Sequence, residues 1–164
     1  MRPRPIPPGP GQESVWDYPR PPRLERVARR VRIVLGGVTI VDTGEALRVV
    51  ETSHPPVYYV PRSAFAGAQL VDGERTTVCE YKGRASYVTL AAGGRTARDA
   101  AWTYVEPASP YAALAGHLAV YPGRVDACFL SEERVRPQGG DFYGGWVTDD
   151  VVGPFKGDPG TWGW

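Results

Sequence analysis

The sequence predicts a mainly β protein, with a single compact antiparallel β domain built as a sandwich or a partly open barrel. Short runs of Val, Ile, Thr, Tyr and Trp alternate with turn-forming Gly, Pro and Asp along the chain. Twenty glycines and seventeen prolines leave little room for long helices, so we expect only short helical turns. With 164 residues, the chain can form one hydrophobic core but is short for two.

The expected domain begins with a β-hairpin. Residues 31–35 and 38–41 are two β-rich runs, and Gly36-Gly37 lies between them. A type I′ turn needs a positive φ angle at both central residues, which glycine accepts without steric cost. The pattern therefore predicts a tight hairpin, and a third strand is expected over residues 46–50.

The rest of the domain is expected to continue as short strands, about eight in all. A helical turn is expected within residues 62–68 and a β-turn at Asp72-Gly73. A hairpin of residues 75–80 and 84–90 should follow around Tyr81-Lys82-Gly83, and then a strand over residues 100–105. A helical turn at residues 111–115 and a last hairpin of residues 116–121 and 124–130 around Pro122-Gly123 should complete the domain. Because side chains alternate along a strand, Ala100, Trp102 and Tyr104 should share one face.

Irregular extensions flank the domain, which we place at residues 31–137. Residues 1–30 form a Pro/Arg-rich arm, and residues 1–13 are expected to be disordered because they offer almost nothing to bury. Trp16 would pack this arm on the domain or on a second subunit, so a homodimer through the arm or through a sheet edge is predicted. Residues 138–164 form a Gly/Trp-rich extension that should pack back over the sheet, with a Trp-rich ligand cage as the alternative.

Composition limits the classes of function. The net charge of +1 gives no global reason to expect a nucleic-acid partner. No apolar run approaches the ~20 residues that span a membrane, and the N-terminus lacks the continuous apolar segment of a signal peptide. A cytoplasmic location with reduced thiols is therefore expected. The two cysteines, Cys79 and Cys128, are too few for a tetrahedral zinc site, and we expect neither a metal nor a cofactor.

Three motifs resemble one bacterial family. They are Glu51-Thr-x-His54-Pro-Pro-x-Tyr-Tyr59-x-Pro61, Cys79-x-Tyr81-Lys82-Gly83 and Ala101-Trp102-x-Tyr104-x-x-Pro107. In this order, over roughly residues 31–129, they look like the bacterial domain of unknown function 427 family. The flanking extensions resemble its longer, actinobacterial form. The resemblance implies a β-tent fold, distantly related to methionine sulfoxide reductase B and to cereblon-type ligand-binding domains. Some relatives in that fold carry a four-cysteine zinc site, which this chain cannot form.

The same motifs mark the candidate site. The candidate ligand-binding residues are Glu51, His54, Tyr59, Tyr81, Lys82 and Trp102, and the candidate catalytic residues are His54, Cys79 and Lys82. We expect residues 51–65 to form one wall of a pocket. The opposite walls would be the Cys79–Gly83 turn and the strand that carries Trp102.

Most of these side chains also have a purely structural interpretation. His54 is either an acid–base group or a histidine that orders the Pro55-Pro56 bend. Cys79 is either a nucleophile or an inert buried thiol. Glu51 would orient His54 or pair with Lys82. Lysine is scarce in this arginine-rich chain, which suggests that Lys82 occupies a position requiring a compact point charge.

Two functions from different classes follow. The favoured one is small-molecule binding in an aromatic-lined pocket. The alternative is an enzyme with Cys79 as nucleophile and His54 as acid–base, which requires the Cys79 sulfur to lie within hydrogen-bond reach of the His54 ring. A nucleotidyltransferase label attached to the family ranks lowest, because the sequence has neither a Gly-rich loop with Lys-Ser/Thr nor Asp-x-Asp. The other histidine, His117, is interpreted as structural.

Overall fold

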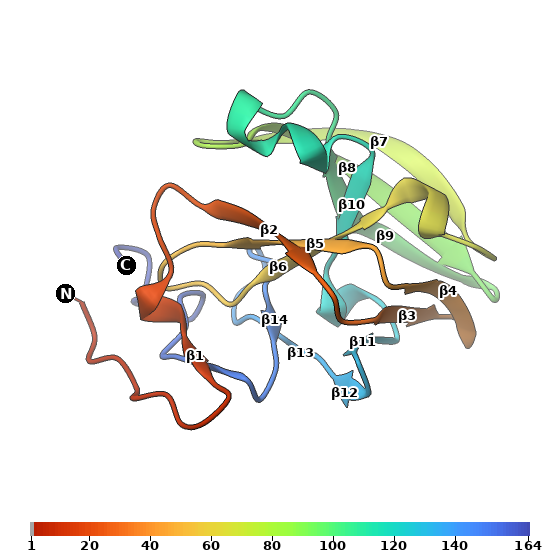
Figure 1. Cartoon of the computed structure of the whole chain (residues 1–164). Coiled ribbons are helices and arrows are strands. Elements are labelled where there is room, and N and C mark those ends of the chain that lie inside the picture. The colour runs from red at the N-terminus through yellow and green to blue at the C-terminus, as the bar shows by residue number, and fades with distance from the viewer. Residues whose placement is uncertain (1) are drawn as a thin grey trace.

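The computed structural model describes residues 2–164, and the predicted mainly β, antiparallel architecture is confirmed. The larger sheet has seven strands, in the spatial order β2 (Arg23–Val27), β5 (Ala46–Val50), β6 (Val57–Pro61), β10 (His117–Val120), β9 (Arg95–Tyr104), β8 (Gly83–Ala92) and β7 (Gln69–Cys79). The smaller sheet has four, in the order β12 (Glu133–Arg134), β11 (Ala127–Leu130), β3 (Val31–Leu35) and β4 (Val38–Thr43). Among the described residues, neither sheet closes into a barrel (Figure 1).

Short elements complete the fold. Two small sheets pair β1 (Glu13–Ser14) with β15 (Val151–Val152), and β13 (Arg136–Pro137) with β14 (Trp146–Val147). The helical segments are single 3-10 turns or little more: η1 (Val15–Asp17), η2 (Arg62–Ala64), η3 (Ser109–Leu114) and η4 (Pro122–Arg124). Within residues 2–164, no helix is long and apolar enough to cross a membrane.

Two Gly-Gly turns organise the hairpins. The predicted hairpin of β3 and β4 is confirmed, with φ of 60° at Gly36 and 74° at Gly37. A second Gly-Gly turn joins β8 to β9, with φ of 57° at Gly93 and 78° at Gly94. The two tips meet, because a Cβ atom on Gly36 or Gly93 would overlap the backbone of the facing turn. Glycine is therefore required at Gly36 and Gly93 both for the turn and for the contact between the hairpins.

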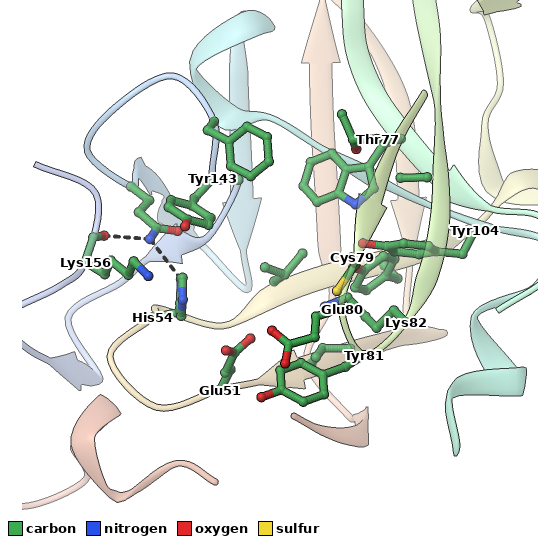
Figure 2. Close-up of a pocket in the computed structure, with 18 of the residues that line it drawn as sticks. Glu51, His54, Thr77, Cys79, Glu80, Tyr81, Lys82, Tyr104, Tyr143 and Lys156 are labelled. Carbon is green, nitrogen blue, oxygen red and sulfur yellow. Dashed lines mark hydrogen bonds between the residues drawn. The ribbon is translucent and has the colours of Figure 1, made fainter. Parts of the chain in front are cut away.

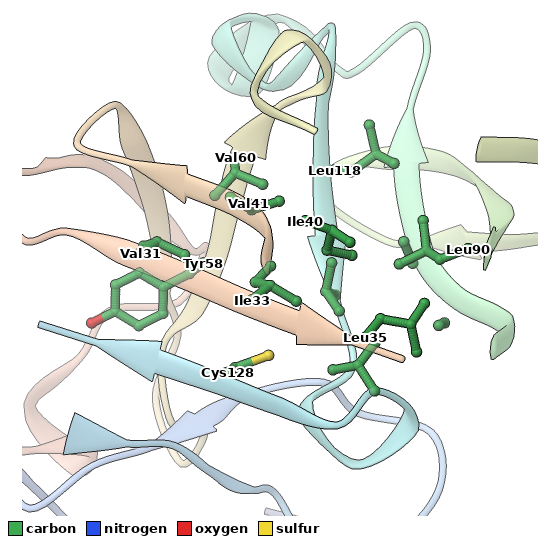
Figure 3. Close-up of a cluster of buried hydrophobic side chains, with 14 of the residues drawn as sticks. Val31, Ile33, Leu35, Ile40, Val41, Tyr58, Val60, Leu90, Leu118 and Cys128 are labelled. Carbon is green, nitrogen blue, oxygen red and sulfur yellow. The ribbon is translucent and has the colours of Figure 1, made fainter. Parts of the chain in front are cut away.

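The aliphatic core lies between the two sheets. Ile33 and Leu35 of β3 are fully buried and pack with Leu118 of β10, Leu90 of β8 and Cys128 of β11 (Figure 3). The opposite face of the seven-stranded sheet is aromatic, with a buried cluster of Tyr59, Tyr87, Trp102, Tyr104, Tyr111 and Tyr121. Strand alternation separates the two sets, since Tyr58 and Val60 of β6 face the aliphatic core while Tyr59 faces the aromatic cluster.

One predicted turn and one predicted hairpin are wrong. Asp72-Gly73 is not a turn, because β7 continues through it with an irregularity in register between Asp72 and Thr76. The last hairpin is also wrong: β10 pairs with β6 and β9, whereas β11 pairs with β3 and β12 in the other sheet. Pro122-Gly123 lies in η4, which redirects the chain from one sheet to the other.

The predicted face of β9 is confirmed only in part. Trp102 and Tyr104 belong to the aromatic cluster, but Ala100 belongs to the aliphatic core. Ala100 lies inside a bulge, because Leu90 of β8 pairs with Ala97 and Val88 pairs with Ala101, and Asp99 has a φ of 49°. Side chains within a bulge do not follow the strand alternation, which is regular again from Ala101 onward.

Both extensions contact the domain. Residues 1–30 contribute β2 to the edge of the large sheet, and the Ile6 N–H donates to the Gly153 carbonyl at 2.9 Å. The two ends of the chain therefore lie side by side (Figure 1). In the C-terminal extension, Trp146 is 1% exposed, and its indole N–H donates to the Val120 carbonyl at 3.0 Å. Trp146 is thus part of the main hydrophobic core.

Candidate functional site

A cavity of about 490 Å³ opens on the aromatic face of the seven-stranded sheet. All of the residues singled out from the sequence line it: Glu51, His54, Tyr59, Cys79, Tyr81, Lys82 and Trp102. They come from the β5–β6 loop, from β6, from the end of β7 and the β7–β8 turn, and from β9. Three motifs that are separate in the sequence therefore meet around one space (Figure 2).

Local backbone geometry fixes the loop that carries His54. Ser53 is fully buried and adopts a left-handed conformation with φ of 73°, which is uncommon for a residue with a side chain. Its N–H donates to the Val15 carbonyl at 3.1 Å, and its carbonyl accepts from the Lys156 N–H at 2.8 Å. The loop is thus held between the N-terminal arm and the C-terminal extension.

The hydrogen bonds of Gln138 identify the protonation form of His54. The Gln138 Oε1 accepts from the Gly145 N–H at 3.0 Å, and its Nε2 donates to the Lys156 carbonyl at 2.6 Å, so the amide has one orientation. The same Nε2 lies 3.2 Å from His54 Nδ1, which must then be the acceptor. The imidazole is therefore neutral, with its proton on Nε2.

The electrostatics of the cavity favour the same form. Burial is the main cause that lowers the pKa of His54, to about 3, and the positive charges of Lys156, Arg20 and Lys82 add to it. The Tyr143 ring stands edge-on to the imidazole, with ring centroids 4.8 Å apart. At neutral pH, His54 is consequently a hydrogen-bond donor rather than a cation.

Glu51 has a partner that neither sequence-based interpretation named. Its carboxylate pairs with Arg20 Nε at 3.0 Å, and Arg20 also donates to the Thr52 carbonyl at 3.1 Å. Only the backbone joins Glu51 to His54, through the His54 N–H and the Glu51 carbonyl at 3.0 Å. The Glu51 carboxylate therefore anchors the arm to the cavity rim.

Lys82 and Cys79 lie across the cavity from His54 (Figure 2). Lys82 is only 9% exposed, and its ammonium group lies 5.8 Å from the centroid of the Tyr104 ring. Cys79 is half-buried and reduced. Among residues 2–164, no hydrogen bond joins Cys79 to His54, so the nucleophile–base pair that the enzyme hypothesis requires is not assembled. The second histidine, His117, lies outside the cavity, and its Nδ1 is 3.2 Å from the Ala115 carbonyl.

Nine of the residues that line the cavity are tyrosine, tryptophan or phenylalanine. Beyond the predicted Tyr59, Tyr81 and Trp102, they are Tyr87, Tyr104, Tyr121, Phe142, Tyr143 and Trp164. Burial raises the pKa of Tyr59 and of Tyr104, so both hydroxyl groups stay protonated and can donate hydrogen bonds.

Sequence reasoning missed three polar residues of the extensions and the tyrosine whose ring contacts His54. Arg20 comes from the N-terminal arm, and Gln138, Tyr143 and Lys156 come from the C-terminal extension. One signal was available for Lys156, because it is one of only two lysines in the chain and the other is Lys82. Nothing in the sequence around Gln138 distinguishes it; its role appears only from its burial, at 4% exposed, and from its three hydrogen bonds.

Comparison with known proteins identifies the family. A family model described as "Domain of unknown function (DUF427)" matches residues 23–131, about two thirds of the chain. The chain therefore belongs to the DUF427 family. The match begins at β2, within the segment that the sequence suggested was an arm, and it ends before the C-terminal extension. No curated protein matches the chain.

Proposed function

We propose that this member of the DUF427 family binds a small molecule in the aromatic-lined cavity. The observation that carries the proposal is the convergence of the three motifs on one concave space of about 490 Å³. Small-molecule sites typically have volumes of roughly 300–1,000 Å³, mostly apolar walls and a few convergent polar groups. Here Tyr59, Trp102 and Tyr104 supply the walls, while His54 and Lys82 supply polar groups.

The thiol of Cys79 provides a direct reporter of occupancy. Cys79 lines the cavity and is half-buried, whereas Cys128 is 1% exposed and lies in the aliphatic core. Burial also raises the pKa of the Cys128 thiol, which suppresses its reactive thiolate form. N-ethylmaleimide should therefore modify one thiol in the folded protein and two after unfolding, as measured by intact mass.

The test uses this modification to block the cavity. Nucleotides, small metabolites and the neutral aromatic probe 2-naphthamide are screened by thermal shift against the wild-type protein, His54→Ala and the N-ethylmaleimide adduct. Compounds that bind in the cavity should raise the melting temperature of the wild type, slow the labelling of Cys79 and have no effect on the adduct. Cys79→Ser, exposed to the same reagent, is the matched control and should still respond. The proposal fails if 2-naphthamide binding survives the modification unchanged.

We also propose, from the sequence, that the protein forms a homodimer and is located in the cytoplasm. The hydrogen bonds of residues 6 and 13 to Gly153 and Asp150 hold the N-terminal arm on its own chain. The edge strand β7 is therefore the better surface for a dimer, since it ends the strand order of the large sheet. Measuring the mass in solution for the wild type and for Val78→Lys, at a position that is 74% exposed, tests this surface.

A further inference from the structure

Both lysines of the chain line the same cavity. The sequence has two lysines and seventeen arginines, and Lys82 and Lys156 come from the β7–β8 turn and from the C-terminal extension. Figure 2 shows them at different sides of the space, Lys156 beside His54 and Lys82 below Tyr104. An ammonium group is a compact charge on a flexible stem, whereas arginine prefers planar, bidentate partners.

Neither lysine pairs with an aspartate or glutamate side chain in the part of the chain that the structure describes. All the ion pairs found there use arginine, although the chain has eighteen acidic residues. Lys82 lies over the Tyr104 ring. Lys156 lies 5.5 Å from the Tyr143 ring centroid and donates, at 3.4 Å, to a main-chain oxygen of Trp164, the last residue of the sequence. Withdrawing an ammonium group from water without a counter-ion is costly, so an anion in the cavity would be stabilised by both groups.

Neither acidic side chain on the cavity wall pairs with a lysine. The wall has two carboxylates, of which Glu51 is paired with Arg20 and Glu80 is exposed at the tip of the β7–β8 turn. The pKa of His54 responds to three cations, Lys156, Arg20 and Lys82, after the larger effect of burial. The neutral imidazole offers an Nε2–H donor, because Gln138 occupies Nδ1. The unpaired polar groups are thus mainly donors, which selects for ligand groups that accept hydrogen bonds.

We propose that the ligand is a small planar organic anion, a carboxylate or a phosphate ester, whose ring packs on the aromatic walls and whose negative charge is stabilised by the ammonium groups of Lys82 and Lys156 on the two sides of the cavity. This inference rests on the proposed function, because it assumes that the cavity binds a ligand. The flat Tyr59, Trp102 and Tyr104 side chains favour a ring over a flexible chain, since aromatic faces pack in offset or edge-to-face arrangements. Charge-assisted hydrogen bonds to the ammonium groups supply the selectivity for an anion.

The test compares three probes that share one ring system: 2-naphthoate, 2-naphthyl phosphate and the neutral 2-naphthamide. Affinities are measured by isothermal titration calorimetry at pH 7.5 for the wild type, Lys82→Met and Lys156→Met. Arg98→Met is the matched control, because Arg98 is exposed, lies outside the cavity and carries the same charge. Methionine retains the apolar stem of each side chain and removes only the charge.

We expect the wild type to bind at least one of the two anions about tenfold or more tightly than 2-naphthamide. Each lysine substitution should weaken anion binding by about tenfold and leave 2-naphthamide binding nearly unchanged, which also shows that the variant is folded. Which anion binds more tightly distinguishes a carboxylate ligand from a phosphate ester. Equal binding of all three probes, or an equal loss in Arg98→Met, overturns the inference and leaves the proposed function standing. If none of the three binds, the inference is overturned, and the proposed function fails as well if no compound of the thermal-shift screen binds.

Discussion

Replacing His54 should remove a measurable part of the acid sensitivity of the fold. In the folded protein, the pKa of His54 is lowered to about 3, mainly by burial, whereas an imidazole in the unfolded chain titrates near ~6.5. The unfolded chain therefore binds more protons between these two values. The contribution of His54 to the free energy of unfolding is therefore fully present above the pKa of the unfolded chain, and it is lost as the pH falls from about 6.5 toward about 3.

The size of the effect follows from the two pKa values. At pH 5, the unfolded state gains about 2 kcal/mol from protonating its imidazole, while the folded state gains almost nothing. His54→Asn keeps a hydrogen-bond acceptor for the Gln138 amide close to the position of Nδ1 and removes the titration. The variant should therefore lose about 2 kcal/mol less than the wild type when the pH falls from 8 to 5.

Urea denaturation at pH 8, 6 and 5 measures the difference. Carboxylates such as Asp126, whose pKa is lowered by the Gly37 N–H and by Arg95, titrate alike in both proteins and cancel in the comparison. His117→Asn controls for the loss of an imidazole outside the cavity. If the stability curves of the wild type and His54→Asn run parallel between pH 8 and pH 5, the neutral state assigned to His54 in the folded protein is wrong.

Two further predictions concern the packing of the fold, each with a matched control and each measured by chemical denaturation. Gly93→Ala should lower the free energy of unfolding by about 3 kcal/mol, because alanine disfavours the positive φ and its Cβ would clash with the facing turn. Gly94→Ala also has a positive φ but meets open space, so it should lower the free energy of unfolding by only about 1 kcal/mol. Equal losses would mean that the two turns do not touch. Trp146→Ala should lower the free energy of unfolding by about 3–5 kcal/mol, because the Trp146 side chain is 1% exposed. The control Trp162→Ala, at a position that is 59% exposed, should change it by less than about 0.5 kcal/mol. A small effect at Trp146 would show that the C-terminal extension does not belong to the core.

The parts of the fold that depend on local chemistry could be predicted from the sequence. The Gly36-Gly37 hairpin is one example, because positive φ at two successive residues is a property of those residues alone. The turn at Pro122-Gly123 shows the limit. A turn signal marks a change of direction but does not say which strand lies beyond it, and here the next strand joins the other sheet. Sheet assignment depends on pairing between distant segments, which local patterns do not encode.

The candidate site shows the same division between local and distant information. The motif residues were found because polar and aromatic groups cluster in short stretches, and the structure brings His54, Cys79 and Lys82 to one cavity. Gln138 was missed because its role depends on contacts with residues far away in the sequence. Lys156 was missed for a different reason: the scarcity of lysine was applied to Lys82 alone, although the same argument held for both.

The C-terminal extension joins the stability of the fold to the proposed binding site. Trp146 is buried in the core, and its backbone N–H donates to the Pro56 carbonyl at 2.8 Å, next to the loop that carries His54. The same extension supplies Gln138, which fixes the His54 ring, and Lys156, which is half of the proposed anion site. Because these groups lie outside the residues that define the family match, the family domain supplies the sheet walls of the cavity while the extension supplies part of its charge. An anion bound to Lys156 should therefore stabilise the extension as well as the cavity, and the thermal shift it produces should shrink in Lys156→Met even when the neutral probe still binds.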